Sequence, residues 1–231
     1  MGNSEFRFKK FSITNQTEGL KVTTDACVLG AISETENPNT ILDIGTGTGL
    51  IALMLAQKYP NSKIKAVEIQ KTIFHQAKSN VSESIYHKQI EVLHGDIKNL
   101  AFEHQFDLIV CNPPYFKNHL AAKNQAKQIA LHNDFLSFED LYFAALKHLE
   151  NDGLFYVIYP LSEFLKFKNI AHNLYLQTEV IIYNKPNQIH RVVGFFSKNS
   201  NVKCFQKSML LHTSDNTRTK EFAELMFDYY L

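Results

Sequence analysis

The sequence predicts an α/β fold, with a largely parallel sheet, helices on both of its faces and a C-terminal antiparallel hairpin. Three observations predict it. Short apolar runs alternate with longer segments of helical periodicity along most of the chain. One apolar run leads into a glycine-rich turn, and polar side chains directly follow several others. The chain has 231 residues, 45% of them hydrophobic, which is enough to bury one large core, so we expect one domain over residues 1–231.

Strands and helices alternate through the first half of the chain. A leading helix is expected over residues 23–33, before the short buried strand 40–44. The apolar run 50–56 has helical spacing and follows the glycines directly. Further strands are expected at 63–69, 89–95 and 106–111, with a helix over 71–84 between the first two of these.

The second half completes the sheet. Ser137 and Asp140 form a helix-start signature for a helix that runs to Glu150, with Asp in the place of the preferred Glu or Gln. The remaining elements follow the same patterns and are expected at 153–159 (a strand), 161–175 (a helix), 179–183 and 192–198 (the closing hairpin) and 220–230 (a helix whose aromatic face belongs to the core).

The glycine-rich turn predicts a nucleotide site. Gly45, Gly47 and Gly49 permit positive φ angles and let backbone N–H groups approach a ligand at a helix N-terminus. A dinucleotide fingerprint requires Gly or Ala where Leu50 stands, and the loop contains no Lys or Arg for a phosphate. The Asp43 carboxylate suits an ammonium instead. S-adenosylmethionine, which has no phosphate and carries an α-ammonium and a sulfonium, is therefore the expected cofactor.

Polar side chains end the successive strands. Glu68 follows Gly49 near the ~20-residue offset at which such folds place a carboxylate on the ribose hydroxyls. Asp96 ends the next strand and is expected to accept a hydrogen bond from the adenine amino group of the cofactor. Each carboxylate alone is more often a surface residue or a helix cap. In series with Asn112 they fall on one edge of a parallel sheet, where open α/β folds bind ligands.

The tetrapeptide Asn112–Tyr115 directly follows the strand 106–111. The Asn112 amide oxygen and the Pro113 carbonyl can both accept hydrogen bonds from an exocyclic amine, which draws its nitrogen towards tetrahedral geometry and frees its lone pair. The two prolines stiffen the corner. Tyr115 can stack on a base, a contact worth roughly 1 to 3 kcal/mol. A proline-terminated strand and loop without chemistry is the alternative interpretation of such a short motif.

Asp43-x-Gly45-x-Gly47-x-Gly49, Glu68, Asp96 and Asn112–Tyr115 together resemble the Rossmann-like class I S-adenosylmethionine-dependent methyltransferases that methylate amino groups. Within that group the chain is similar to the bacterial tRNA1(Val) adenine-37 N6-methyltransferase family. The closer resemblance lies in the segments 6–11, 19–31 and 190–197. It implies a mostly parallel seven-stranded sheet, with residues 36–231 as the core and residues 1–35 as an arm and helix that contribute to the cofactor and substrate sites.

The resemblance also implies roles for individual residues. The catalytic residues are expected to be Asn112, Pro113, Pro114 and Tyr115. The cofactor residues are expected to be Thr24, Asp25, Asp43, Gly45, Gly47, Gly49, Glu68, Asp96, Ile97 and Asn112. The residues that bind the substrate are expected to be Phe8, Lys9, Lys10, Lys21, Tyr115, His190 and Arg191.

The expected reaction is an in-line displacement in which the N6 nitrogen of a tRNA adenine attacks the sulfonium methyl. An unpaired anticodon-loop adenine suits the site, since flipping such a base costs least. We expect the unassigned segment 116–134 to be a mobile lid over that base. His119 and His132 in this segment lack paired carboxylates or cysteines, so no metal site is expected.

Composition sets further expectations. The net charge is only +1, so RNA contact requires local clusters such as the basic and aromatic segment 6–11. Three widely separated cysteines indicate a reduced compartment, and no signal peptide or membrane-crossing apolar run is present, which favours the cytoplasm. We expect no obligatory protein partner. Two kinds of alternative stay open: another acceptor, namely rRNA guanine N2, DNA adenine or protein glutamine, and a non-catalytic S-adenosylmethionine-binding protein that recognises RNA.

Overall fold

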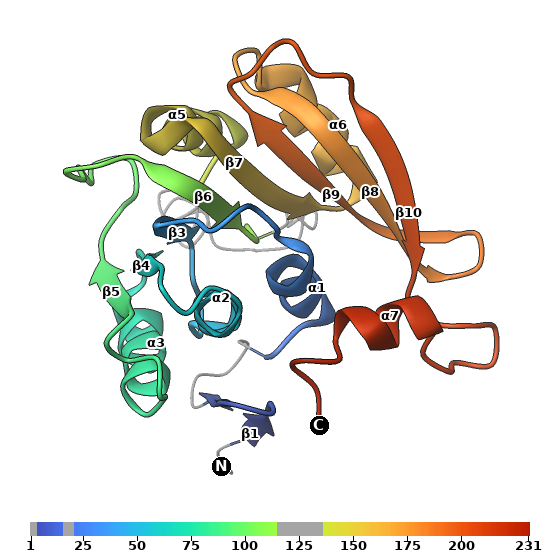
Figure 1. Cartoon of the computed structure of the whole chain (residues 1–231), viewed down its shortest axis with the longest axis horizontal. Helices are drawn as coiled ribbons and strands as arrows, with labels where there is room; N and C mark the ends of the chain where they lie inside the picture. Colours follow the sequence, from blue (N-terminus) through green and yellow to red (C-terminus); the bar gives the residue numbers. More distant parts are fainter. Residues whose placement is uncertain (1–3, 16–20, 115–135) are drawn as a thin grey trace, which may run out of the picture.

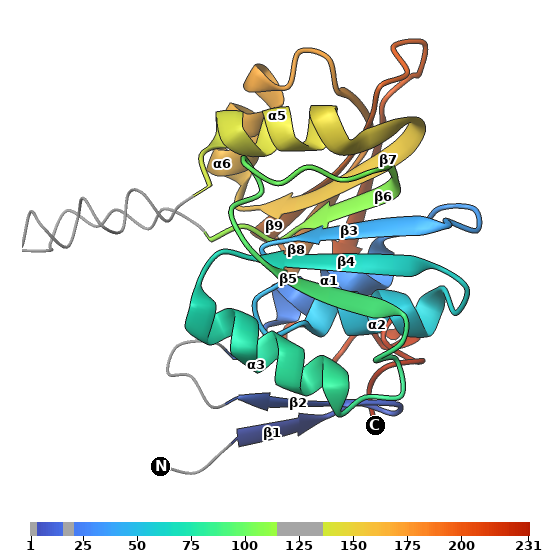
Figure 2. The ribbon, with the colours of Figure 1, turned by 90° about the vertical axis from the view of Figure 1, so that its left-hand side faces the viewer.

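The computed structural model describes residues 4–15, 21–114 and 136–231, and it has a twisted sheet at its centre with helices on both faces (Figures 1 and 2). Within these ranges the main sheet has eight strands in the order β10-β8-β9-β7-β6-β3-β4-β5. The strands are β3 (Thr40–Ile44), β4 (Lys63–Glu68), β5 (Ile90–His94), β6 (Phe106–Cys111), β7 (Leu149–Tyr159), β8 (Tyr175–Lys185), β9 (Gln188–Ser197) and β10 (Phe205–Leu210). β9 runs antiparallel to β7 and β8, and the other neighbouring pairs are parallel.

Helices cover the two faces of the sheet, as the alternation of the sequence predicts. They are α1 (Thr24–Ile32), α2 (Leu50–Lys58), α3 (Lys71–Ser82), α5 (Phe138–His148), α6 (Leu161–Ile170) and α7 (Lys220–Leu225). Figure 2 shows α1, α2 and α3 below the sheet and α5 and α6 above it. The predicted helix start at Ser137 is confirmed, because its side chain accepts from the Asp140 backbone N–H and Asp140 accepts in return. Among the described segments, none of the helices has the length and apolarity to cross a bilayer.

The core is divided between the two faces because side chains alternate along each strand. In β3, Ile41 belongs to the cluster under α1 and α2, whereas Leu42 belongs to the cluster under α5 and α6. Neighbouring β6 alternates in the same way, with Leu108 on the first side and Ile109 on the second. All four side chains are fully buried. The central strands therefore form a rigid platform for the loops at their carboxyl ends.

The structure corrects several predicted boundaries. Within the described residues the main sheet has one strand more than the seven expected, because β10 was not predicted: most of its side chains are exposed and leave no apolar run. Strands β7, β8 and β9 are longer than predicted, and β7 begins at Leu149, where the preceding helix was expected to continue. Helices α6 and α7 end five residues before the predicted 175 and 230, at Ile170 and Leu225.

The N-terminal segment forms a hairpin of β1 (Ser4–Arg7) and β2 (Ser12–Asn15), which was not predicted. Phe8 is only 4% exposed, and its ring stacks on that of Phe11 at 4.6 Å between centroids. The Phe8 ring is therefore part of the core, in contrast to the expectation that it contacts substrate. Lys9 and Lys10 are exposed at the hairpin turn, where the Lys9 ammonium lies 4.1 Å from the centroid of the Phe227 ring.

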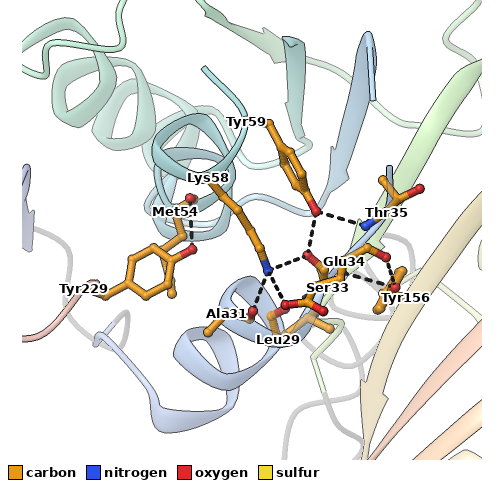
Figure 3. A network of polar contacts seen from close by, with 10 residues as sticks. All are labelled: Leu29, Ala31, Ser33, Glu34, Thr35, Met54, Lys58, Tyr59, Tyr156 and Tyr229. Atoms are coloured by element: carbon orange, nitrogen blue, oxygen red, sulfur yellow. Dashed lines mark hydrogen bonds and ion pairs between the residues drawn. The ribbon is translucent and has the colours of Figure 1, made fainter. Parts of the chain in front are cut away.

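The half-buried ammonium of Lys58 fixes the C-terminal end of α1 (Figure 3). The Lys58 Nζ atom donates to the carbonyls of Ala31, at 2.8 Å, and Ser33, at 3.1 Å, and lies 3.3 Å from Glu34 Oε1. These carbonyls end a helix and have no partner within it, so the cation both satisfies them and complements the helix dipole. Burial lowers the pKa of Lys58. The anchor holds α1 in place, and thereby the functional residues at its other end.

Candidate active site

A cavity of about 350 Å³ opens where the carboxyl ends of β3, β4 and β6 meet the N-terminal end of α1. Three predicted features line it together: the glycine loop, the end of β4 with Glu68, and the corner that follows β6. The described residues that line it are Lys21, Thr23, Asp25, Ala26, Ile44, Gly45, Thr46, Gly47, Thr48, Leu50, Ile51, Glu68, Ile69, Gln70, Ile73, Cys111, Asn112, Pro113, Pro114 and Leu136. The sheet edge thus gathers polar groups that are far apart in the sequence.

The glycine loop has the backbone that its sequence predicts. Gly45, Gly47 and Gly49 have φ angles of 69°, 60° and 84°, a region that L side chains rarely adopt. A Cβ added at Gly45 or Gly47 would meet no atom within 4 Å, so open space lies before both residues. Gly45 and Thr46 both donate their backbone N–H to the Val67 carbonyl, which ties the loop to β4. A ligand can therefore approach this backbone closely.

Asp43 lies beneath the loop. The carboxylate is fully buried, and its Oδ2 atom accepts a hydrogen bond of 2.6 Å from Thr46 Oγ1. Its Oδ1 atom has no hydrogen-bond partner among the described residues. Burial raises the pKa of Asp43 to about 7, and the nearby charge of Glu68 adds to the effect. Asp43 is not among the residues that line the cavity, so its expected contact with an ammonium stays a prediction.

Glu68 faces the cavity directly. It is 6% exposed, and each carboxylate oxygen accepts one backbone hydrogen bond, from Gly47 N at 3.1 Å and from Gln70 N at 2.9 Å. Burial raises the pKa of Glu68, and the backbone hydrogen bonds oppose that rise. Each oxygen of a carboxylate has a second lone pair, so Glu68 can also accept hydrogen bonds from the two hydroxyls of a ribose.

Two other residues expected at the cofactor, Asp96 and Ile97, are not among the residues that line the cavity. The Asp96 Oδ1 atom accepts a hydrogen bond from Lys98 N at 3.0 Å, and its Oδ2 atom lies 3.5 Å from Lys98 Nζ. Ile97 is 5% exposed and belongs to the core cluster under α5 and α6. A contact of Asp96 with the adenine of a cofactor stays a prediction.

Asn80 supports the glycine loop and was not predicted. Its Nδ2 atom donates to the Thr48 carbonyl at 2.8 Å, and its Oδ1 atom accepts from Thr14 N of the N-terminal hairpin at 3.0 Å and from Gln76 Nε2 at 3.3 Å. Asn80 is 3% exposed and Gln76 is 5% exposed. The available signal was their spacing: two amides one turn apart on the apolar face of an amphipathic helix indicate buried polar partners.

The corner after β6 completes the cavity floor. Pro113 is buried, Asn112 is half-buried, and Pro114 is exposed, and all three line the cavity. Tyr115 lies outside the described residues, as does the predicted lid 116–134. Burial raises the pKa of Cys111 well above its ordinary value, so this thiol stays protonated and is no nucleophile. An amine bound at Asn112 and Pro113 would share one cavity with a ligand on the glycine loop.

Asp25 connects α1 to β9. Its Oδ1 atom lies 2.7 Å from His190 Nε2, and its Oδ2 atom accepts a hydrogen bond of 2.6 Å from Arg191 Nε. Burial raises the pKa of Asp25, but the hydrogen bond from His190 and the charge of Arg191 outweigh it, so this pKa lies below its ordinary value. One residue expected at the cofactor and two expected at the substrate are therefore a single cluster.

The residues that precede Asp25 in the sequence differ in whether they line the cavity. Lys21 is exposed and lines the cavity. Thr23 lines it too, and its hydroxyl caps α1 by accepting from Ala26 N at 3.2 Å. Thr24 was the residue expected at the cofactor, but it is exposed and is not part of the lining.

The lining fits S-adenosylmethionine. The glycine backbone is open to a ligand, Glu68 offers acceptors for ribose hydroxyls, and the glycine loop contains no cation that would repel a sulfonium. The buried acid Asp43, with an oxygen that has no hydrogen-bond partner among the described residues, adds negative charge behind the loop when it is ionised. Apolar side chains of Ile69 and Ile73 line the part of the cavity next to Glu68 and suit a purine face.

The chain is similar to known methyltransferases in sequence. A family model described as "Methyltransferase small domain" matches residues 25–190. A relative from Dyadobacter fermentans is 35% identical, over 99% of this chain and 98% of its own length. One from Phocaeicola vulgatus is 37% identical, over 100% of this chain and 99% of its own length. Both relatives are named tRNA1(Val) (adenine(37)-N6)-methyltransferase.

Solved structures share the fold. A protein from Agrobacterium tumefaciens, described as a predicted O-methyltransferase, superposes with a TM-score of 0.70 at 16% identity, over 89% of this chain and 96% of its own. A Listeria monocytogenes protein that bears the name of a class I S-adenosylmethionine-dependent methyltransferase superposes with a TM-score of 0.58 at 14% identity, over 88% and 67%. At such identities the likeness concerns the fold and leaves the methyl acceptor open.

Proposed function

The chain belongs to the tRNA1(Val) (adenine(37)-N6)-methyltransferase family, and on this premise we propose that it transfers the methyl group of S-adenosylmethionine to N6 of adenine 37 in tRNA1(Val). The relatives match along the whole chain, so the comparison includes both the glycine loop and the corner after β6. The observation that carries the proposal is that Asn112 and Pro113 line the same cavity as Gly45, Gly47 and Glu68. An amine acceptor and a nucleoside donor can meet there.

On the donor side, this chain supplies binding and orientation. Bound S-adenosylmethionine would provide an electrophilic methyl group on a sulfonium. We infer that Glu68 accepts hydrogen bonds from its ribose hydroxyls, because its two oxygens are held by Gly47 N and Gln70 N and face the cavity. The loop backbone at Gly45 and Gly47 lies alongside the donor, since nothing fills the space before these two residues. Holding reacting groups in this way can contribute ~7 to 11 kcal/mol to catalysis.

On the acceptor side, the corner prepares the amine. The Asn112 side-chain oxygen and the Pro113 carbonyl would accept the two N–H bonds of the adenine amino group. The nitrogen lone pair then leaves conjugation with the ring and points at the methyl group. The C–S bond breaks as the new N–C bond forms, and S-adenosylhomocysteine is the leaving group. A base is not required before the transfer, because the amine loses its proton to solvent after it has been methylated. Stacking of Tyr115 on the adenine is part of the proposal and concerns a residue outside the described ranges.

The proposed target lies in the anticodon loop. An unpaired adenine there leaves its stack at low cost, so little binding energy is needed to bring it into the cavity. The three separated cysteines and the tRNA substrate of the relatives support action in the cytoplasm. No protein partner is part of the proposal.

The test is mass spectrometry of tRNA from a strain of the source organism that lacks the gene. We expect N6-methyladenosine at position 37 of tRNA1(Val) to be lost, to return with the wild-type gene, and to stay absent with an Asn112→Ala variant. Loss of a methyl group from DNA, from a guanine of rRNA or from a protein digest, with tRNA1(Val) unchanged, would overturn the proposed acceptor. Full rescue by Asn112→Ala would overturn the proposed mechanism.

A further inference from the structure

The cluster of Asp25, His190 and Arg191 has the wrong charge for binding an ammonium group. The Asp25 carboxylate carries one negative charge, and Arg191 carries one positive charge at a contact of 2.6 Å. His190, whose Nε2 lies 2.7 Å from the other carboxylate oxygen, adds either nothing or a second positive charge. These three side chains together are therefore neutral or cationic, and the exposed Lys21 adds a further cation to the cavity lining.

The position of the cluster favours the acceptor. β9 begins at Gln188 but pairs with β7 only from Val192, which lies opposite Tyr159. Residues 188–191 thus project beyond the carboxyl end of β7. β6 is parallel to β7, with Cys111 opposite Val157, so the projection lies at the same sheet edge as the Asn112 corner. Asp25 connects this projecting hairpin to α1, across 165 residues of sequence.

The chemistry of the cluster suits a phosphodiester. A guanidinium has five N–H donors in a planar fork, and it can hold a carboxylate and a phosphate at the same time. The Arg191 fork is already oriented, since Nε donates to Asp25 Oδ2 and Nη1 donates to the His190 carbonyl at 2.6 Å. A prearranged side chain loses less conformational entropy on binding. A base flipped into the Asn112 corner brings the phosphates on either side of it to the cavity rim.

We propose that Asp25, His190 and Arg191 form one site for a phosphate of the RNA strand next to the target adenine, and that Asp25 is a positioning residue of this site rather than a cofactor ligand. The inference rests on the proposed function. It changes the role expected for Asp25 and joins three residues into one unit. Arg191 contacts the phosphate, His190 holds the second carboxylate oxygen, and Asp25 sets the direction of both.

The test uses the full-length protein with purified tRNA1(Val) and measures KM for tRNA, kcat and the Kd of S-adenosylmethionine separately. Asp25→Asn keeps the shape of the side chain and removes its charge. We expect KM for tRNA to rise by about 10-fold, while kcat and the Kd of the cofactor stay within about 2-fold. A ≥10-fold weaker cofactor with an unchanged KM would overturn the inference and restore Asp25 as a cofactor ligand.

Salt dependence supplies a readout that a purely structural role would not change. A lost phosphate contact in a single strand reduces the slope of log affinity against log salt by about 0.7. We expect this change for Arg191→Gln and less of it for Arg191→Lys, which keeps the charge without the fork. Lys63→Gln is the matched control, because Lys63 is an exposed cation at the opposite end of the sheet, at the start of β4. An Arg191→Gln slope equal to that of the wild type would overturn the inference, even if Asp25→Asn failed to fold.

The same measurements separate this inference from the proposed function. A wild-type protein that does not methylate tRNA adenine would overturn the proposed function. A wild-type protein that methylates tRNA1(Val) normally, with Asp25→Asn and Arg191→Gln showing unchanged KM and salt slopes, would overturn only the phosphate site.

Discussion

Two buried aspartates lie on different sides of the cavity and have opposite electrostatic environments. Asp43, beneath the glycine loop, has a hydroxyl partner and another acid nearby, and its pKa is raised to about 7. Asp25, at the start of α1, has a histidine and an arginine as partners, and its pKa is lowered. The neighbours of each aspartate, rather than the residue type, therefore decide which ligand charge each side of the cavity can accept.

The glycine-loop side has excess negative charge and suits a cationic donor, whereas the side formed by α1 and β9 is neutral or cationic and suits an anionic RNA strand. The Asn112 corner lies between them, so the proposed function places the methyl transfer where the two environments meet.

Asn112→Ala should affect catalysis and leave both sides of the cavity intact. Removing one oriented acceptor should lower kcat by roughly 100-fold, by analogy with the loss of a single preorganised polar contact, with the Kd of S-adenosylmethionine within about 2-fold. Single-turnover kinetics and calorimetry measure the two effects separately. Asn61→Ala is the control, since Asn61 is an exposed turn residue between α2 and β4. Normal turnover combined with weak cofactor binding would show that Asn112 binds the cofactor and does not act on the amine.

Glu68→Ala should weaken only the binding of S-adenosylmethionine. The loss of two hydrogen bonds from ribose to a charged acceptor should raise the Kd of S-adenosylmethionine by roughly 10- to 100-fold, while KM for tRNA stays unchanged. Glu68→Gln, which keeps one acceptor oxygen, should have an intermediate Kd. Calorimetry that finds wild-type affinity in both variants would exclude Glu68 from the cofactor site.

Asn80→Ala should weaken the binding of S-adenosylmethionine indirectly, through the glycine loop. The Thr48 carbonyl would lose its partner in a buried place, at a cost of about 1 to 3 kcal/mol to the free energy of unfolding, and the glycine loop would become less ordered. We expect a lower Tm and a Kd for the cofactor raised by about 10-fold. Lys78→Ala, on the exposed face of the same helix, is the control. An unchanged Tm would show that the loop does not depend on this amide.

The pH dependence of cofactor binding should reflect Asp43. Its folded-state pKa of about 7 lies above the ordinary 3.8, so the folded chain holds this proton more tightly than the unfolded chain does. The stabilisation that results is fully present below about pH 4 and is lost as the pH rises towards about 7. A cationic ligand favours the ionised acid, so its binding near pH 7 should release part of a proton and become a few-fold tighter between about pH 6 and 8. Asp43→Asn should remove both effects in calorimetry with buffers of different ionisation enthalpy.

The donor side could be predicted from sequence because its signals are local. Gly45, Gly47 and Gly49 stand within five residues of one another, and the short apolar run of β3, whose last four residues are all buried, predicts the strand that leads into them. The cluster of Asp25 with His190 on the side formed by α1 and β9 could not be predicted in this way. Its contact spans 165 residues of sequence and depends on how the hairpin packs. Sequence reasoning placed all three residues at the site and assigned them to different ligands.

The N-terminal segment shows a different limit. Basic residues interleaved with Phe6, Phe8 and Phe11 are typical of an RNA-binding arm, but the same spacing fits a short hairpin with one buried face. The structure has the hairpin, with Phe8 and Phe11 in the core and Phe6 partly exposed. β10 was missed for the opposite reason, since an edge strand with exposed side chains has no apolar pattern.

A structure of the protein with bound S-adenosylmethionine tests the division of the cavity most directly. We expect the ribose on Glu68, the methionine part of the cofactor beside the glycine loop, and the sulfonium methyl facing Asn112 and Pro113 with room for a purine between. Asp25 should keep its contacts with His190 and Arg191. A cofactor whose ammonium lies on Asp25, or whose methyl faces away from the corner, would contradict the account.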